Sequence, residues 1–187
     1  MCSAAHLLRA GTYVVPGGNA YTYTQVLGPE VKAKLRAFVE GGGLYIGTCA
    51  GWFYASTGYY WEYDTSWPDA GFWSYPSLLG IFMANVEGSI TDIADEETKP
   101  HVFDGHALTE LSNGHHAIYY GGPTLGWHRT SESALPAGSV VLARYSNVIA
   151  HPPAIVRVAS NIGGRTENEA TRIPRMLLFS CHLEAYE

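Results

Sequence analysis

Short apolar runs alternate with one amphipathic segment along the first third of the chain. β-Rich residues over 12–15 end at a Pro-Gly-Gly-Asn loop, and the apolar run Leu44–Ile46 leads into Gly-Thr-Cys-Ala-Gly. Between the two runs, apolar side chains recur at helical spacing, which predicts a helix over 29–40. The predicted buried stripe of that helix consists of Val31, Leu35, Phe38 and Val39. A further helix is predicted from Ala50, so the alternation favours a parallel α/β sheet.

The rest of the chain is predicted to add strands and one aromatic excursion. Strands are expected over 115–122, 139–145, 154–159 and 176–180. The aromatic-rich stretch Tyr59–Tyr75 is interpreted as a loop over the mouth of the site, either a small aromatic core or a wall on which a substrate stacks. No repeat or linker divides the sequence, which predicts one domain over residues 1–187.

Composition narrows the function classes. The chain has 187 residues, 15% of them charged, and a formal net charge of -6, which argues against a nucleic-acid surface. It has no apolar run near the roughly 20 residues that cross a membrane. Three cysteines do not form a disulfide framework and favour a reducing, cytoplasmic location. The histidines between positions 101 and 128 match no familiar ligand spacing, so neither a metal nor a cofactor is expected.

Cys49 is the residue with the clearest chemical interpretation. A cysteine at a tight turn between a strand and a helix lies at the positive end of that helix, which lowers a thiol pKa and exposes the thiolate. Gly47 and Gly51 suit a turn that larger side chains would block. The alternative is a buried cysteine in a glycine-rich turn, since free cysteine commonly behaves as a small apolar residue.

Two further motifs occur where the ends of parallel strands would gather. His182 and Glu184 follow the last predicted strand, so the imidazole would serve as general base and the carboxylate would orient it. Backbone N–H groups of the Gly17-Gly18 loop and of Ala50 would converge beside Cys49 as an oxyanion site. Ligands of such sheets bind at the carboxyl ends of strands, which predicts that these motifs meet.

Together these motifs resemble the class I glutamine amidotransferase-like superfamily. A closer resemblance is to the amidotransferase-like N-terminal domain of eukaryotic-type biotin–protein ligases, through V-V-P-G-G-N, G-G-G-L-Y-I-G-T-C-A-G, I-Y-Y-G-G-P and the terminal H-x-E. The resemblance spans residues 13–184. It implies a three-layer, flavodoxin-like fold with helices on both faces of a mostly parallel sheet. It also implies a Cys49–His182–Glu184 triad and attack on a small-molecule amide or related acyl substrate, with Gly18 and Ala50 as oxyanion donors.

The chain departs from the family pattern at its start. The family has a β-α unit before the Pro-Gly-Gly strand, and the residues ahead of position 11 are too few to supply one. The sequence leaves four explanations open. A second copy of the chain in a homo-oligomer fills the gap, another segment fills it, a strand edge is left open and prone to association, or the N-terminus is truncated. The aromatic stretch after Cys49 does not resemble a glutamine pocket. The second hypothesis is therefore a non-catalytic binding or regulatory module of the biotin–ligase type.

Overall fold

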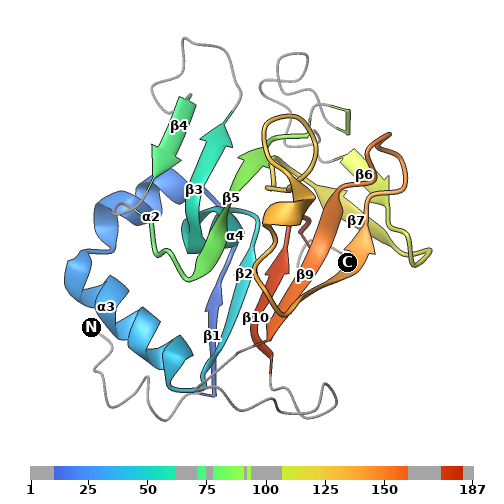
Figure 1. The fold of residues 1–187 in the computed structure, drawn as a ribbon. Helices are drawn as coiled ribbons and strands as arrows, with labels where there is room; N and C mark the ends of the chain where they lie inside the picture. Colours follow the sequence, from blue (N-terminus) through green and yellow to red (C-terminus); the bar gives the residue numbers. More distant parts are fainter. Residues whose placement is uncertain are drawn as a thin grey trace.

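A five-stranded sheet forms the centre of the molecule (Figure 1). The computed structural model describes residues 11–61, 71–74, 78–90, 92–93, 107–159 and 174–182. The strand order is β1-β2-β10-β9-β8. Strands β1, β2 and β10 are parallel, β9 runs antiparallel to β10, and β8 runs antiparallel to β9, so four strands share one direction. The predicted α/β fold with a mostly parallel sheet is confirmed. The strands are β1 (Thr12–Val15), β2 (Leu44–Thr48), β8 (Ser139–Arg144), β9 (Pro153–Ala159) and β10 (Pro174–Phe179).

The predicted helix over 29–40 is present with the predicted bounds, as α3 (Pro29–Glu40). Proline is tolerated at its start because the first amides of a helix have no acceptor within the helix. Gly42 follows the helix with φ +109, a conformation that favours glycine. Leu35, Phe38 and Val39 are buried, as predicted. Val31 is 37% exposed, so its place in the buried stripe was wrong. The other helices are α2 (Ala20–Val26), α4 (Ala50–Ala55) and the short 3-10 turn η1 (Glu132–Ala134).

Two smaller sheets flank the centre. The first has the order β4-β3-β5, in which β3 (Ser56–Trp61) pairs parallel with β5 (Phe82–Gly88) and antiparallel with β4 (Gly71–Ser74). The loop predicted over Tyr59–Tyr75 is therefore wrong for residues 59–61 and 71–74, which form strands, and its residues 62–70 and 75 lie outside the described ranges. Tyr59 and Trp61 pack edge-on against Phe53 of α4, with ring centroids 5.0 and 5.3 Å away. That packing stabilises the first part of the aromatic-rich stretch as a strand rather than a loop. The second is the hairpin of β6 (Ala107–Glu110) and β7 (His116–Tyr119).

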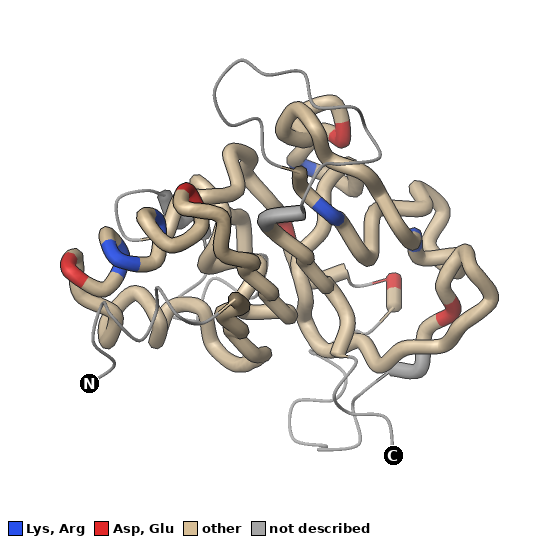
Figure 2. Tube along the Cα trace, turned by 90° about the horizontal axis from the view of Figure 1, so that it is seen from below, with Lys and Arg blue, Asp and Glu red and all other residues tan. Residues whose placement is uncertain are grey.

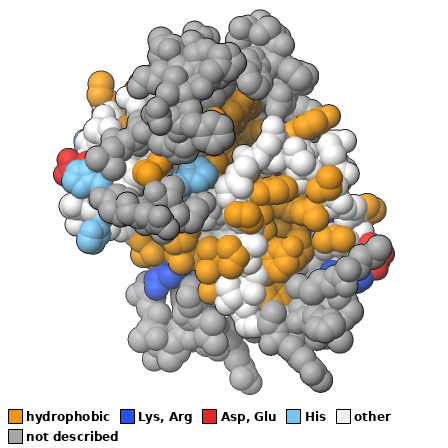
Figure 3. Space-filling model, turned by 180° about the vertical axis from the view of Figure 1, so that it is seen from behind, with side chains coloured by type: hydrophobic (Ala, Val, Ile, Leu, Met, Phe, Trp, Pro, Cys, Tyr) orange, Lys and Arg blue, Asp and Glu red, His pale blue; other side chains and the backbone are white. Residues whose placement is uncertain are grey.

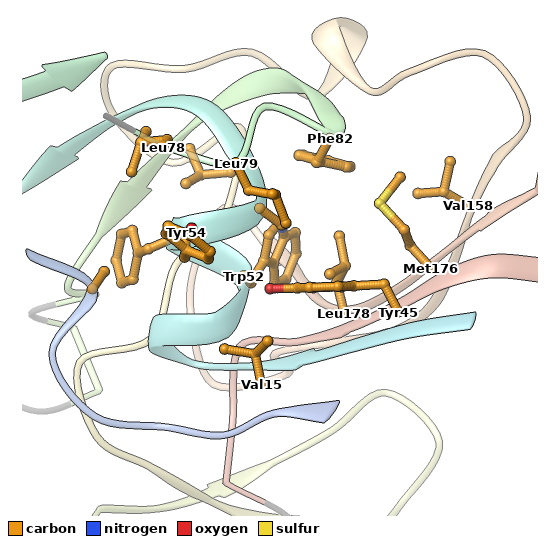
Figure 4. Close-up of a cluster of buried hydrophobic side chains, with 14 of the residues drawn as sticks. Val15, Tyr45, Trp52, Tyr54, Leu78, Leu79, Phe82, Val158, Met176 and Leu178 are labelled. Carbon is orange, nitrogen blue, oxygen red and sulfur yellow. The ribbon is translucent and has the colours of Figure 1, made fainter. Parts of the chain in front are cut away.

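The main core lies on one face of the central sheet (Figure 4). Side chains from β2, β9 and β10 pack there against α4, with the fully buried Trp52 at the centre. Helices α2, α3 and α4 all place buried residues in this cluster. On the opposite face, residues paired across neighbouring strands form a row from Val14 on β1 to Val140 on β8. These two end residues are 57% and 40% exposed. Hydrophobic side chains also gather on the surface seen from behind (Figure 3).

Charged residues are few and scattered along the described backbone (Figure 2). Basic and acidic positions are interspersed, and α3 carries both signs, including the Glu30–Lys34 pair one turn apart, at 2.6 Å. None of the helices in the described ranges is both long enough and apolar enough to traverse a lipid bilayer.

Glu87 is a buried carboxylate that holds the loop after Thr124. It is 2% exposed at the end of β5 and accepts backbone N–H bonds from each residue of the run 127–130, besides the hydroxyl of Thr130 at 2.6 Å. Desolvation by burial acts to raise the pKa of Glu87, but these hydrogen bonds outweigh it and hold the pKa below its ordinary value. The carboxylate therefore joins two segments that are about 40 residues apart in sequence.

Replacing Glu87 by glutamine is expected to destabilise the fold by about 3 kcal/mol at pH 7, since a neutral amide cannot accept all five bonds. A carboxyl with a depressed folded pKa stabilises above its unfolded pKa of about 4.3, and this stability is lost as pH falls through the folded pKa. Urea unfolding at pH 7 and below pH 4 measures both effects. The gap between wild type and E87Q should shrink in acid, whereas E30Q, at an exposed ion pair, should change little. A gap that does not shrink in acid would refute the role of charge.

Candidate active site

Cys49 occupies a sharp turn between β2 and α4. Its backbone has φ 50 and ψ -107, a conformation that non-glycine residues rarely adopt. The Cys49 N–H donates to the carbonyl of Phe179 on β10 at 2.7 Å, and the Cys49 carbonyl accepts from the Trp52 N–H at 2.9 Å. The turn is thus held by a neighbouring strand on one side and a helix on the other. The predicted strand–turn–helix context of Cys49 is confirmed by this geometry.

The two glycines beside Cys49 permit close backbone packing. A Cβ on Gly51 would lie 2.3 Å from the carbonyl oxygen of Val15, at the end of β1. A Cβ on Gly47 would lie 2.9 Å from the Gly51 backbone. The Tyr45 hydroxyl donates to the Gly51 carbonyl at 2.7 Å inside the core. The glycines therefore allow α4 to begin directly against the ends of the strands.

The Cys49 thiol is nearly covered, with 4% of the residue exposed. Its Sγ donates to the backbone carbonyl of Tyr120 at 3.4 Å, just after β7, so this geometry holds the neutral thiol. Helix α4 has only six residues, so its dipole is weaker than that of a longer helix. Activation of this thiol would therefore require a neighbouring base more than the helix.

His182 lies beside the Pro-Gly-Gly loop, as the sequence predicts. The backbone N–H of His182 donates to the carbonyl of Ile118 at 2.7 Å, and this bond joins the end of β10 to β7. The imidazole covers Gly17, where a Cβ would lie 2.3 Å from its Cε1 atom. The ring also faces Tyr120, with centroids 6.4 Å apart. Cys49 and His182 thus share Tyr120 as a neighbour at the carboxyl ends of the parallel strands.

The remaining predicted residues have different outcomes. Gly18 has φ +143, which favours glycine, and a Cβ there would lie 3.3 Å from the Tyr23 hydroxyl. Ala50 is 1% exposed and is the first residue of α4, so its N–H is among those without an acceptor in the helix. Glu184 lies outside the described residues, so its role as the orienting carboxylate stays a prediction.

Comparisons with known proteins agree with this fold. Residues 7–69 match the family model of the biotin-protein ligase N-terminal domain, a span that includes the Pro-Gly-Gly loop and Cys49. A crystal structure of a glutamine amidotransferase superimposes with a TM-score of 0.56 at 20% identity, covering 97% of this chain and 75% of that one. A search of curated protein sequences found no match. The chain has a glutamine amidotransferase-like fold. The resemblance seen in the sequence is confirmed at the level of fold and of the biotin–ligase N-terminal segment.

Within this amidotransferase-like fold, two tyrosines near the site were not predicted. Tyr120 accepts from the thiol through its carbonyl and lies beside the imidazole. Tyr23, on α2, donates from its hydroxyl to the carbonyls of the loop that begins at Pro16. The sequence signal that could have identified Tyr120 is its place between a predicted strand and a glycine turn. Tyr23 has no sequence signal, because its contact depends on the angle between loop and helix.

No metal centre is present among the residues that the structure describes, where no three of His, Cys, Asp and Glu converge. Cys181 is fully buried in a second core cluster with Tyr145 and Tyr119, so its thiol belongs to the core.

Proposed function

We propose that the protein is a cysteine-dependent amidohydrolase or amidotransferase-like enzyme that acts on a small-molecule amide or related acyl substrate. The observation that carries the proposal is the strained turn at Cys49, whose thiol lies against Tyr120 while the His182 imidazole lies against the same residue and Gly17. Backbone strain at a residue with a nucleophilic side chain, such as cysteine, is typical of a reactive site. The amidotransferase-like fold supports the same class of reaction.

The reaction begins with proton transfer from the thiol to the imidazole of His182. The thiolate sulfur attacks the carbonyl carbon, and the π electrons move to the oxygen, where backbone N–H groups of Gly18 and Ala50 stabilise the negative charge. Collapse of this intermediate breaks the C–N bond, and the imidazolium returns its proton to the leaving amine. Water then cleaves the thioester with the same imidazole as base, releasing the acid and the free thiol.

A specific observation favours the second hypothesis, a non-catalytic module. The thiol is 4% exposed and donates to a backbone carbonyl, a geometry that stabilises the protonated form. The family segment matched over 7–69 is also that of a biotin-protein ligase N-terminal domain. In this alternative the turn at Cys49 serves packing, and the thiol never reacts with a carbonyl.

Acyl transfer from p-nitrophenyl acetate separates the two hypotheses. The enzyme hypothesis predicts a burst of nitrophenolate equal to one acetyl group per chain, and its loss in C49A. The variant C181A removes a buried thiol that is not part of the proposed machinery and should retain the burst. A burst that persists in C49A, or no burst above the rate of free thiol in solution, would support the non-catalytic module.

A further inference from the structure

The hydroxyl of Tyr23 binds the Pro-Gly-Gly loop at two consecutive points. It lies 3.1 Å from the carbonyl oxygen of Pro16 and 3.1 Å from that of Gly17. Tyr23 is on α2, the helix that follows this loop directly, so the side chain reaches back over its own turn. Two successive carbonyls therefore point toward one donor.

This arrangement fixes the direction of the loop's N–H groups. In a planar trans peptide the N–H points opposite to the carbonyl. The Gly17 N–H is in the same peptide group as the Pro16 carbonyl, and the Gly18 N–H is in the same peptide group as the Gly17 carbonyl. Both N–H groups consequently point away from the Tyr23 hydroxyl and side by side, which is the arrangement of a backbone anion site.

Tyr23 is itself held firmly at this position. Asn19 caps α2 by accepting the Thr22 N–H at 3.3 Å, which sets the start of the helix. The Tyr23 ring packs edge-on against Tyr54 of α4, with centroids 5.9 Å apart. Burial raises the pKa of Tyr23, and the nearby Cys49 raises it further, so the hydroxyl remains a proton donor at neutral pH. The residue thus ties the loop to the helix that begins at Cys49.

We infer that Tyr23 is a positioning residue that holds the Gly17–Gly18 peptide so that its N–H faces the oxygen of a carbonyl attacked by Cys49. The inference rests on the proposed function. Tyr23 acts through the loop and does not touch the reacting atoms. Glycine at position 18 fits beside this tyrosine, because its φ of +143 favours glycine and a Cβ there would lie 3.3 Å from the Tyr23 hydroxyl.

The test compares two reactions of the same thiol in Y23F, which keeps the ring against Tyr54 and removes the hydroxyl. Attack on p-nitrophenyl acetate develops a negative oxygen, whereas alkylation by iodoacetamide occurs at a saturated carbon. We expect Y23F to slow acylation of Cys49 by about tenfold, as for a weakened oxyanion donor, and to change alkylation by less than about twofold. Y21F, an exposed tyrosine two residues earlier on α2, should leave both rates unchanged. Equal slowing of both reactions, or of neither, would overturn the inference.

Amide hydrogen exchange at Gly17 and Gly18 keeps the two proposals separable. If wild-type Cys49 is alkylated but never acylated, the proposed function fails, and exchange then decides the role of Tyr23. Faster exchange at both glycines in Y23F than in Y21F supports a hydroxyl that fixes the loop. Identical exchange in the two variants shows that the loop does not depend on Tyr23.

Discussion

Replacing His182 by alanine is expected to slow acyl transfer to Cys49 by about two orders of magnitude at pH 7. The Cys49 thiol donates to the Tyr120 carbonyl, so in the proposed mechanism a base must remove its proton before attack. The imidazole lies against Tyr120 and Gly17 and has its Nε2 atom buried, so the proposed base and the thiol share Tyr120 as a neighbour.

The dependence of this loss on pH identifies its cause. A free thiol has a pKa of about 8.5 and is only a few per cent ionised at pH 7. As the pH rises, hydroxide removes the thiol proton without a protein base, so the rate of H182A should approach the wild-type rate. Stopped-flow acylation from pH 6 to 10 measures both limits.

A matched histidine variant controls for nonspecific effects. His116, on β7, is exposed, and H116A should follow the wild-type profile. A constant ratio between H182A and wild type at every pH would indicate a structural defect rather than a lost base. Equal rates at pH 7 would remove His182 from the mechanism.

Replacing Gly122 by alanine is expected to destabilise the fold by about 3 kcal/mol or more. A Cβ at this position would lie 1.7 Å from the carbonyl oxygen of Ser180, and 2.7 Å from its carbonyl carbon. The obstacle is backbone at the end of β10, so a change of side-chain rotamer cannot relieve it. The Gly122 carbonyl also accepts from the buried Tyr119 hydroxyl at 2.8 Å, which resists displacement of the turn.

The same substitution should disturb the site, because Ser180 is two residues before His182. Denaturant unfolding of G122A measures the stability, and acylation under folding conditions measures the displacement of His182. G11A is the control, since a Cβ there meets no atom within 4 Å, and it should stay within about 0.5 kcal/mol of wild type. Wild-type stability in G122A would contradict the close approach of the turn to β10.

The sequence predicts the local elements of this molecule better than its long-range contacts. Helix α3 could be placed to the residue because an apolar stripe, an initial proline and terminal glycines all agree. Cys49, His182 and the Pro-Gly-Gly loop could be brought together because parallel strands end at one edge of a sheet. These predictions needed only local pattern and one rule of topology.

Long-range contacts explain what the sequence could not predict. The aromatic stretch from Tyr59 forms part of a second sheet because its rings pack on Phe53, a contact without local signal. Glu87 was not identified because its five donors lie about 40 residues away. Tyr23 was missed because its hydroxyl depends on the angle at which α2 leaves the loop. In each case a tertiary contact decides the role of a side chain whose neighbours in sequence are unremarkable.

The most direct test of a nucleophilic Cys49 is to identify the residue that becomes acylated. Intact-mass measurement after brief exposure to p-nitrophenyl acetate, followed by peptide mapping, locates the acetyl group among Cys2, Cys49 and Cys181. We expect one acetyl group per chain, on Cys49, absent from C49A and strongly reduced in H182A at pH 7. An unmodified Cys49, or the same extent of labelling in H182A at matched times, would contradict it.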